Sequence, residues 1–599
     1  MKNLFSRTLS RSVTNTGLGG WKLLLPLLAL ATLAPAQNAP RREDVLQALR
    51  KATGFFRDTV ATHGVYHFAY AEDVSYGRSE QKEGPTTFEV QREGTPVVGM
   101  AYLETYAATG DRYYLEAARA TALALVAGQH CSGGWDYFIE FDPAERKKYP
   151  YRVDGPCRDL TEYPGNPVTS LDDNQTQAVM RFMARVDKAL EFKDAKIHEA
   201  TRYAFDSLIK AQYPNGAWPQ RFGRYPDPAK HPVKQASYPQ SWPWKWPGSN
   251  YQSHYTFNDN SISDMIDAYL EAARIYNEPR YLAAAEKGGA FMLLAQMPEP
   301  QPAWAQQYDA AMHPAWARIF EPPAVTGGES QGIMRTLMVL YRETGNRKYL
   351  EPLPRALAYL KRSALPPVAN PSEIRRRTMG RGGNRTVLAR FYELQTNKPL
   401  YVTKGTRVSV KGGSSSLLNG YELTYDDSSV ITHYSVLTSG EELPAIEAEY
   451  QLLAKAAPAS VRRPDELHGL SPWSERPRAT PAAKALAPRV AVAIASLVAR
   501  GAWTEEGNIG KSDRIIQVFA AREMVLQIGK QNIPVNENDM IELFQGKETP
   551  RQRVIRSQTF ARIVDLVCDY LRTLKELMTG GASKFNRLWR REDDDDSLT

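Results

Sequence analysis

The stretch QYPNGAW, Gln212–Trp218, decides the fold of this chain, because two related stretches occur elsewhere at a nearly constant interval. One is QHCSGGW at Gln129–Trp135, and the other is the longer AQMPEPQPAW at Ala295–Trp304. The three tryptophans are 83 and 86 residues apart. An interval of this length indicates one structural unit that the chain uses several times.

The segment before each of these loops also recurs, as TGDRYYLEAARATALALV, KDAKIHEATRYAFDSLI and NEPRYLAAAEKGGAFMLL. A fourth version, TGNRKYLEPLPRALAYL, begins at residue 344. Each reads as a turn followed by an amphipathic helix, and residues 43–60, 94–109 and 113–128 have helical spacing too. Two helices and a long loop per repeat predict a mainly α fold, an incomplete (α/α) toroid or barrel of helical hairpins whose loops converge on one face.

Other parts of the chain have a different character. The basic segment RRRTMGRGGNR (375–385) is typical of a surface loop, and Leu388 to Tyr434 is rich in β-branched and aromatic residues, which predicts a small sheet beside the toroid. The predicted domains are a signal peptide (1–36), the toroid (37–365), the basic loop with a small β-rich subdomain closing the site (366–455), a Pro/Ala-rich linker (456–488), a C-terminal helical segment (489–579) and a disordered acidic tail (580–599).

The N-terminus has the three parts of a secretory signal peptide. Basic residues without an acid precede the run LLLPLLALATLA, and Ala34-Pro35-Ala36 offers a cleavage site. A membrane anchor is the alternative, but this run is short for a span. We therefore expect a secreted or periplasmic protein, in which Cys131 and Cys157 could form the one disulfide.

Composition excludes several classes of function. The formal net charge of +8 is spread along the chain, so nucleic acid is not indicated, although an anionic substrate would suit the excess. No internal apolar run reaches the roughly 20 residues that a membrane helix needs, so no stable span is expected after signal cleavage. We expect a monomer.

Two acidic clusters precede helices with apolar spacing. Asp172 and Asp173 stand in SLDDNQTQ, and Asn258 and Asp259 stand in HYTFNDN. Each cluster alone is typical of a helix N-cap. At the ends of successive hairpins, however, they would place oxygen ligands on one face, which suits Ca²⁺ better than a metal that prefers soft ligands.

The loop Trp304–Gly332 is rich in aromatic, amide and charged residues without helical spacing, which is typical of a binding surface. It contains Gln307, Asp309 and Arg318, the last close to Glu321, with which a salt bridge is the simpler interpretation. Flat aromatic rings cover sugar faces well, and the best candidates for a sugar cleft are Trp242, Trp244 and Trp246. Trp135 and Trp218 could equally hold the hairpins together.

From about residue 95 to 395 the motifs NGAWPQ, YTFNDN, AWAQQYD, PAWARIFEPPAVTGGES and LARFYEL resemble the family 10 polysaccharide lyases, which are pectate lyases on an (α/α) toroid. The resemblance implies Ca²⁺-assisted anti β-elimination on polygalacturonate or pectin, with Arg318 as the base. It also implies that Asp259 and Asp173, with Asp172 as the rival of Asp173, bind Ca²⁺ or substrate, and that substrate is further bound by Arg390, Trp304, Gln307, Asp309, Trp218 and Asn258.

Three alternatives remain open at this point. The QxxxGxW strings also resemble the repeats of triterpene cyclases, although the long repeat and the signal peptide disfavour that activity. A glycoside hydrolase could use Asp173 and Asp259 as acid and base. A binding protein without catalytic activity could use the same toroid, because fold does not fix function. The chain also carries a long insertion, Gly223 to Asn250, relative to the family pattern.

Overall fold

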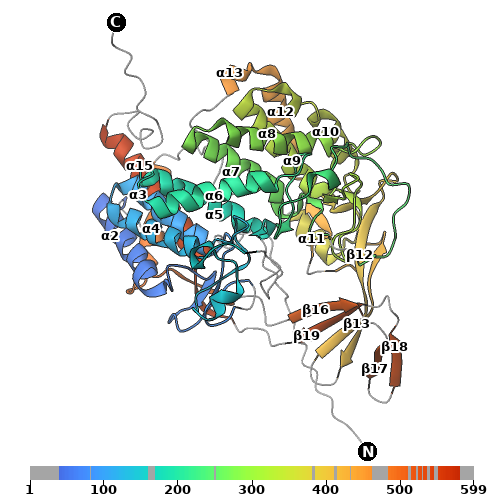
Figure 1. Ribbon diagram of the computed structural model, residues 1–599, viewed down its shortest axis with the longest axis horizontal. Coiled ribbons are helices and arrows are strands. Elements are labelled where there is room, and N and C mark those ends of the chain that lie inside the picture. Colours follow the sequence, from blue (N-terminus) through green and yellow to red (C-terminus); the bar gives the residue numbers. More distant parts are fainter. Residues whose placement is uncertain are drawn as a thin grey trace, which may run out of the picture.

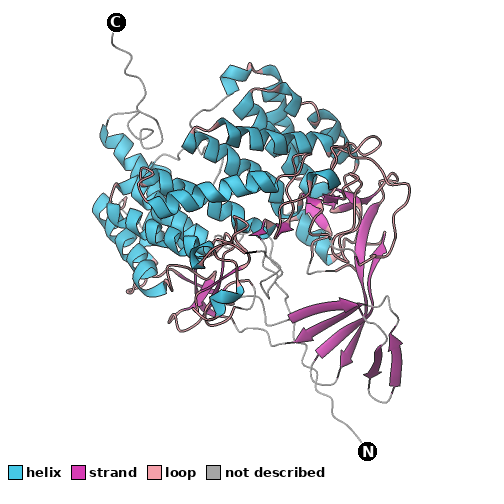
Figure 2. Ribbon diagram, viewed as in Figure 1, coloured by secondary structure: helices cyan, strands magenta, loops and turns pink. Residues whose placement is uncertain are grey.

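The computed structural model describes residues 39–579, except for 81–82, 159–168, 249–250, 381–382, 384, 411–413, 432–433, 462–482, 510–514, 521–523, 529–530, 536–539 and 546–550. The predicted signal peptide and acidic tail lie outside the described residues, as does most of the predicted linker. Helices dominate the rest, with short strands in small sheets (Figure 2). This confirms the predicted mainly α fold class.

The helices come in antiparallel pairs that succeed one another across the molecule (Figure 1). The first helix of each pair packs against the first helix of the next pair. Of these inner helices, α5 and α7 are buried along most of their length. The pairs form the predicted incomplete toroid; they are α3 (Thr95–Thr109) with α4 (Arg112–Ala127), α5 (Gln175–Ala189) with α6 (Ala195–Ala211), α7 (Ser261–Tyr276) with α8 (Pro279–Leu294), and α9 (Gly327–Thr344) with α10 (Leu353–Arg362).

Local signals fix the helix ends. Gly110, at φ 75°, ends α3 in the left-handed conformation that glycine adopts without a steric penalty. Asp111 then caps α4 by accepting a hydrogen bond from the Tyr113 amide, and Asp194 caps α6 in the same way. The turn between the two helices of a hairpin is therefore encoded in the sequence.

The repeated tryptophans close each hairpin from within. The indole nitrogens of Trp135, Trp218 and Trp304 donate to the carbonyl oxygens of Leu125, Leu208 and Met292, each at 2.8 Å, and all three rings are buried. Each loop is thereby tied back to the end of the helix that precedes it. The repeat detected in the sequence is this packing device.

Short antiparallel strand pairs connect the two ends of each hairpin. In each pair of helices, the inner helix is the first and the outer helix the second. One strand comes just before the inner helix, and its partner follows the loop after the outer helix. This pairing brings the amino ends of all inner helices to one face. The pairs are β3 (Thr87–Glu89) with β4 (Phe138–Glu140), β5 (Thr169–Ser170) with β6 (Arg221–Phe222), β7 (Tyr255–Thr256) with β8 (Gln307–Tyr308), and β9 (Ala324–Thr326) with β11 (Phe391–Glu393).

The C-terminal helical segment adds one more unit of this kind. Trp503 follows α14 (Ala483–Ala495), and its indole donates to the Ala493 carbonyl at 2.8 Å. β15 (Thr504–Gly507) then pairs with β20 (Gln552–Arg556), which leads into the inner helix α15 (Ser557–Thr579). Here the outer helix comes first in the chain. α15 packs against α3 and α2 (Arg42–Phe55), and just past the end of α2 the rings of Phe56 and Phe560 stack with their centroids 3.9 Å apart.

The predicted small sheet lies beside the hairpins, with strands in the order β13-β12-β11-β9. Its long strands are β12 (Pro399–Val410) and β13 (Ser414–Thr424), and β10 (Val387–Ala389) pairs with β14 (Leu437–Ser439). The prediction of a loop at 375–385 was wrong in part, because α11 (Glu373–Met379) occupies residues 375–379. Its cap is Ser372, and Arg375 is buried against Asp427.

The remaining elements flank this frame; they are η1 (Phe56–Val60), β1 (Ala69–Ala71), β2 (Gly77–Arg78), η2 (Glu145–Lys148), η3 (Arg152–Asp154), η6 (Pro228–Lys230), η8 (Arg347–Tyr349), α12 (Leu443–Lys455), α13 (Pro458–Val461), β16 (Ile515–Ala520), β17 (Met524–Ile528), β18 (Gln531–Val535) and β19 (Met540–Gln545). Cys131 and Cys157 form a disulfide with a Cα–Cα distance of 5.6 Å, and Cys568 is buried with a free thiol. Within the described part of the chain, no helix combines the length and apolar character needed to cross a bilayer.

Candidate active site

Two identical turns present the acidic clusters at the amino ends of α5 and α7. The turns are η5 (Asp172–Asn174) and η7 (Asn258–Asn260). In each turn, two consecutive residues, Asp173 with Asn174 and Asp259 with Asn260, have positive φ angles between 47° and 58°. Such a conformation costs energy and persists only where the surrounding structure imposes it, which is common at functional sites.

The interpretation of these acids as helix caps was wrong. Neither helix has a side-chain capping bond at its amino end. The left-handed turns instead bring the carboxylates together, so that oxygen atoms of Asp172, Asp173 and Asp259 all lie within 4.8 Å of one another. Three carboxylates at this spacing repel one another unless they bind protons or a cation.

Asp172 has fixed hydrogen-bond partners. The Tyr137 hydroxyl donates to one carboxylate oxygen at 2.8 Å, and the Gln220 amide donates to the other at 3.0 Å. Both partners come from strand-forming segments that follow repeat tryptophans. Asp172 is therefore held in place from two neighbouring hairpins.

The other two carboxyl groups have raised pKa values. Burial, followed by the charges of Asp259 and Asp172, raises the pKa of Asp173 to about 8. Asp259 keeps some contact with solvent, yet removal of water by the surrounding protein, together with Asp172, raises its pKa to about 7. A divalent cation would relieve this repulsion, and carboxylate oxygens are ligands that Ca²⁺ prefers. The three residues therefore fit a hard cation.

Arg318 is paired with Glu321 through three hydrogen bonds. The backbone amide and Nε of Arg318 donate to Oε2 at 2.9 Å each, and Nη2 donates to Oε1 at 2.7 Å. Burial lowers the pKa of Arg318, but the Glu321 carboxylate outweighs it and the net pKa is raised. Burial opposes ionisation of Glu321 as well, and the arginine charge still lowers its pKa to about 2.

Arg390 links this pair to the acidic turns. Its Nη2 donates to Asn258 Oδ1 at 3.0 Å, Gln306 Oε1 at 3.2 Å and Glu329 Oε1 at 2.9 Å. The Asn258 amide in turn donates to Asp259. Burial lowers the pKa of Arg390, but Tyr434 and the acids nearby raise it overall. The arginines and the carboxylates thus belong to one connected site.

Sequence reasoning missed several residues of this site, namely Tyr137, Gln220, Glu329, Tyr434 and Gln306. The Tyr434 hydroxyl donates to Glu321 at 2.7 Å, and the Gln306 amide donates to the same oxygen at 2.8 Å. Gln306 precedes the predicted Gln307 in AWAQQYD. Side chains alternate along an extended segment, so only one of two adjacent glutamines can face the site. Knowing how β8 pairs with its neighbouring strand would have identified Gln306 as that glutamine.

Four predicted substrate-binding residues lie elsewhere. Trp218 and Trp304 are buried in the core, where they hold their hairpins closed. The Gln307 amide donates to backbone carbonyls within its own loop, among them that of Glu321 at 3.5 Å. Asp309 accepts from the Ala311 and His313 amides and so closes a turn. Gln307 and Asp309 shape the loop that carries Arg318, and the side chains of all four residues lie outside the arginine and carboxylate cluster.

The insertion Gly223 to Asn250 is fastened to the same loop by two reciprocal bonds. The Trp246 indole donates to the carbonyl of Ala317, and the Trp316 indole donates to the carbonyl of Pro243, both at 2.8 Å. Ala317 is the neighbour of Arg318 in the chain. The insertion therefore forms part of the surroundings of the site.

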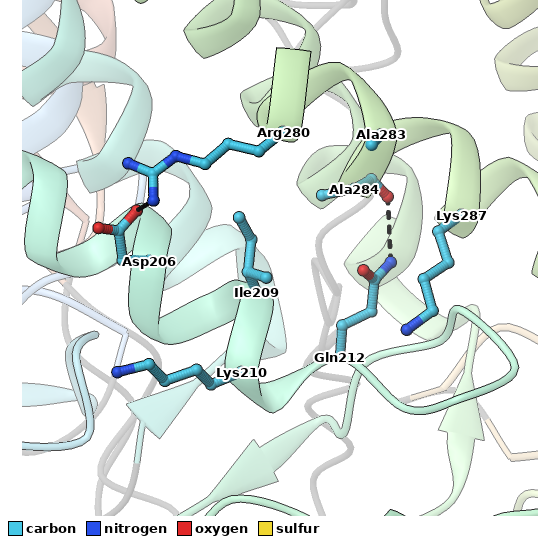
Figure 3. A pocket seen from close by; sticks show the side chains of 8 residues that line it. All are labelled: Asp206, Ile209, Lys210, Gln212, Arg280, Ala283, Ala284 and Lys287. Atoms are coloured by element: carbon cyan, nitrogen blue, oxygen red, sulfur yellow. Dashed lines mark hydrogen bonds and ion pairs between the residues drawn. The ribbon is translucent and has the colours of Figure 1, made fainter. Parts of the chain in front are cut away.

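A separate shallow pocket lies between α6 and α8 (Figure 3). Within it Arg280 pairs with Asp206 at 3.0 Å, and the Gln212 amide donates to the Ala284 carbonyl at 3.0 Å. It contains none of the residues predicted for catalysis or cation binding; its lining is Asp206, Ile209, Lys210, Gln212, Arg280, Ala283, Ala284 and Lys287. The acid and arginine cluster is the better candidate for an active site.

Almost all residues of the acid and arginine cluster lie within one region that matches a known protein family. Residues 158–412 match the pectic acid lyase family. This match confirms the resemblance to polysaccharide lyases and supports lyase activity on a polysaccharide. Of the residues that form the cluster, Tyr137 and Tyr434 lie outside the pectic acid lyase region. No curated protein matches the chain.

Solved structures are similar to parts of this chain. A family 10 polysaccharide lyase from Cellvibrio cellulosa is 20% identical, with 60% of this chain and 97% of that chain covered and a TM-score of 0.38; a mutant of it in complex with trigalacturonic acid gives the same values. A GH76 α-mannanase from Bacteroides thetaiotaomicron is 12% identical, with 53% and 68% covered and a TM-score of 0.30.

Proposed function

We propose that the protein is a pectate lyase that cleaves polygalacturonate, or a related acidic polysaccharide, by β-elimination. The observation that carries this proposal is the meeting of three carboxylates, within 4.8 Å of one another, with the connected pair Arg390 and Arg318. An elimination next to a carboxylate builds up negative charge and needs cations more than it needs a nucleophile.

The carboxylate cluster fits a calcium ion by its donor atoms and by its need for a counter-charge. Asp172, Asp173 and Asp259 would hold the ion. When bound, Ca²⁺ supplies positive charge that neutralises a uronate carboxylate and makes the neighbouring C5 proton more acidic. The proposal of Ca²⁺ rests on the chemistry of these residues and on the resemblance.

The protein's own groups then have separate tasks. Arg390 binds the uronate carboxylate, with its position fixed by Asn258 and Glu329. Arg318, in its neutral form, takes the C5 proton; the electron pair of that bond forms the C4–C5 double bond, the bond from C4 to the glycosidic oxygen breaks, and the departing oxygen gains a proton from water. Glu321 holds the Arg318 guanidinium in position, although its charge also makes loss of a proton from Arg318 harder.

The test is to incubate the purified protein with polygalacturonate and follow ultraviolet absorbance of the unsaturated product. We expect absorbance to rise, to stop with a chelator and to return with added Ca²⁺. The Arg318→Ala variant should bind the polymer and leave it intact. A flat trace for the wild-type protein under all conditions would rule out the lyase.

A glycoside hydrolase is the second candidate, because the raised pKa values of Asp173 and Asp259 suit a general acid. The spacing of 4.8 Å or less leaves no room for the water that an inverting enzyme places between its carboxyl groups, about 6.5–9.5 Å apart. A retaining hydrolase would release reducing ends without any double bond. Measuring both products on one sample separates the two reactions.

We also propose that the protein acts outside the cytoplasm. The disulfide between Cys131 and Cys157 is of the kind that persists in oxidising compartments. Fractionation of cells that express the full chain would test this location, and retention of the protein in the cytoplasm would contradict it.

A further inference from the structure

A row of aromatic rings lies on the surface beside the candidate active site. Trp242 and Trp244 come from the insertion, and their ring centroids are 5.4 Å apart. Tyr425, which follows β13, continues the row at 5.7 Å from Trp244. We call these three residues the aromatic row. Trp244 is 41% exposed and Tyr425 is 47% exposed, which is unusual for side chains of this size.

The aromatic row is linked to the active site through shared packing. Trp242 packs against the cluster of Ala324, Phe391 and Leu400, and Tyr434 packs against the same cluster. Tyr434 in turn donates to Glu321, the partner of Arg318. One apolar cluster therefore supports both the aromatic row and the residue that contacts Glu321.

The geometry and charge of the row favour one kind of occupant. The interplanar angles are 31° between the two tryptophans and 60° between Trp244 and Tyr425, so the three rings present differently inclined faces. Lys398 lies 5.0 Å from the centre of the Tyr425 ring, and Lys245 is an exposed neighbour of Trp244. Rings that can cover sugar faces stand next to cations that can meet carboxylates.

The row is also held in place. The Tyr425 hydroxyl donates to Glu393 at 2.7 Å, and the reciprocal bonds of Trp246 and Trp316 fix the insertion. Exposed rings that are fixed in this way lose little conformational freedom when a ligand covers them.

We propose that the aromatic row binds the uronate polymer where it extends beyond the reacting bond, and so makes the enzyme prefer long chains. This inference rests on the proposed function for the identity of the polymer. The row lies in the insertion and at the end of β13, both apart from the motifs that carry the family resemblance. Its task is binding, and no step of the reaction requires it.

The test compares Trp244→Ala, Tyr425→Ala and the double variant with the wild-type protein on polygalacturonate and on trigalacturonate. We expect each substitution to raise KM for the polymer roughly three- to tenfold, as the loss of one stacked ring would. The value of kcat, and all constants on the trimer, should stay unchanged. Trp244→Phe and Tyr425→Phe should retain most of the affinity, which guards against a trivial loss of folding.

Phe192→Ala is the matched control, because Phe192 is 41% exposed but lies just beyond the carboxyl end of α5, whereas the carboxylates lie at its amino end. A second readout does not depend on catalysis, namely retardation of the protein in gels that contain polygalacturonate or a neutral glucan. Retardation by the acidic polymer alone, lost in the double variant and kept in Phe192→Ala, supports the row even if no lyase product forms. Equal KM values and equal retardation for all variants would overturn the inference and leave the rings a packing role only.

Discussion

Glu321 accepts three hydrogen bonds from Arg318, at 2.9, 2.9 and 2.7 Å, and so controls both the position and the protonation of the proposed base. The salt bridge holds the guanidinium in place for the proposed reaction. The same carboxylate that orients the guanidinium raises its pKa.

Replacing Glu321 with Gln should move the pH profile of kcat to lower pH. The amide keeps part of the hydrogen bonding and removes the negative charge, so the pKa of Arg318 falls and its neutral form becomes accessible at lower pH. Initial rates across a pH series check this. Glu329→Gln is the control, because it removes a charge beside Arg390 instead. An unshifted pH profile in Glu321→Gln would mean that Arg318 binds the substrate carboxylate and that another group takes the proton.

Calcium should stabilise the protein most at alkaline pH. In the folded protein the pKa of Asp173 is about 8 and that of Asp259 about 7, whereas both carboxyl groups titrate at about pH 4 in the unfolded chain. Without a cation, the folded chain therefore binds more protons than the unfolded chain between about pH 4 and pH 8. Its stability falls as pH rises through this range. Added Ca²⁺ should restore the lost stability, and more so as pH rises.

Thermal melting with chelator and with Ca²⁺ at several pH values measures this effect. Asp173→Asn and Asp259→Asn should abolish the calcium response, while Asp309→Asn, which alters an acid outside the cluster, should retain it. A calcium response of equal size in all three variants would place the cation elsewhere.

Replacing Trp218 with Phe should reduce stability and leave substrate affinity unchanged. The phenyl ring keeps much of the packing but leaves the buried Leu208 carbonyl without its 2.8 Å donor, which costs about 1–3 kcal/mol. Urea unfolding measures the loss. Trp503→Phe should lose a similar amount, since its indole makes the equivalent bond to Ala493. A change in KM at unaltered stability would instead return Trp218 to the substrate-binding residues.

Removing the disulfide should destabilise the first repeat loop. Cys157→Ser opens a bridge between residues 26 positions apart, for which a loss of about 2–4 kcal/mol is typical. Melting under non-reducing and reducing conditions checks this, since reduction should shift the wild-type protein toward the variant. Cys568→Ala, at the free buried thiol, should respond to reduction as the wild-type protein does.

The sequence by itself determined the hairpins, because apolar spacing, the caps Asp111 and Asp194 and the repeated tryptophans are local signals. With the family resemblance, it also brought forward Arg318, Arg390 and the acids Asp172, Asp173 and Asp259 as the candidate catalytic and binding residues. The C-terminal repeat went unrecognised, although RGAW at Arg500–Trp503 resembles the other loops, because its inner helix follows the loop in the chain.

Tertiary structure alone decided which of these residues meet. Two left-handed turns, which no spacing rule predicts, converted apparent helix caps into one carboxylate cluster. The alternation around β8 turned Gln306 toward Glu321 and Gln307 toward its own loop. Trp218 and Trp304 are buried in the core, where they are not accessible to a substrate. The exposure of an aromatic ring depends on what distant segments pack against it, and a local sequence pattern carries no information about those segments.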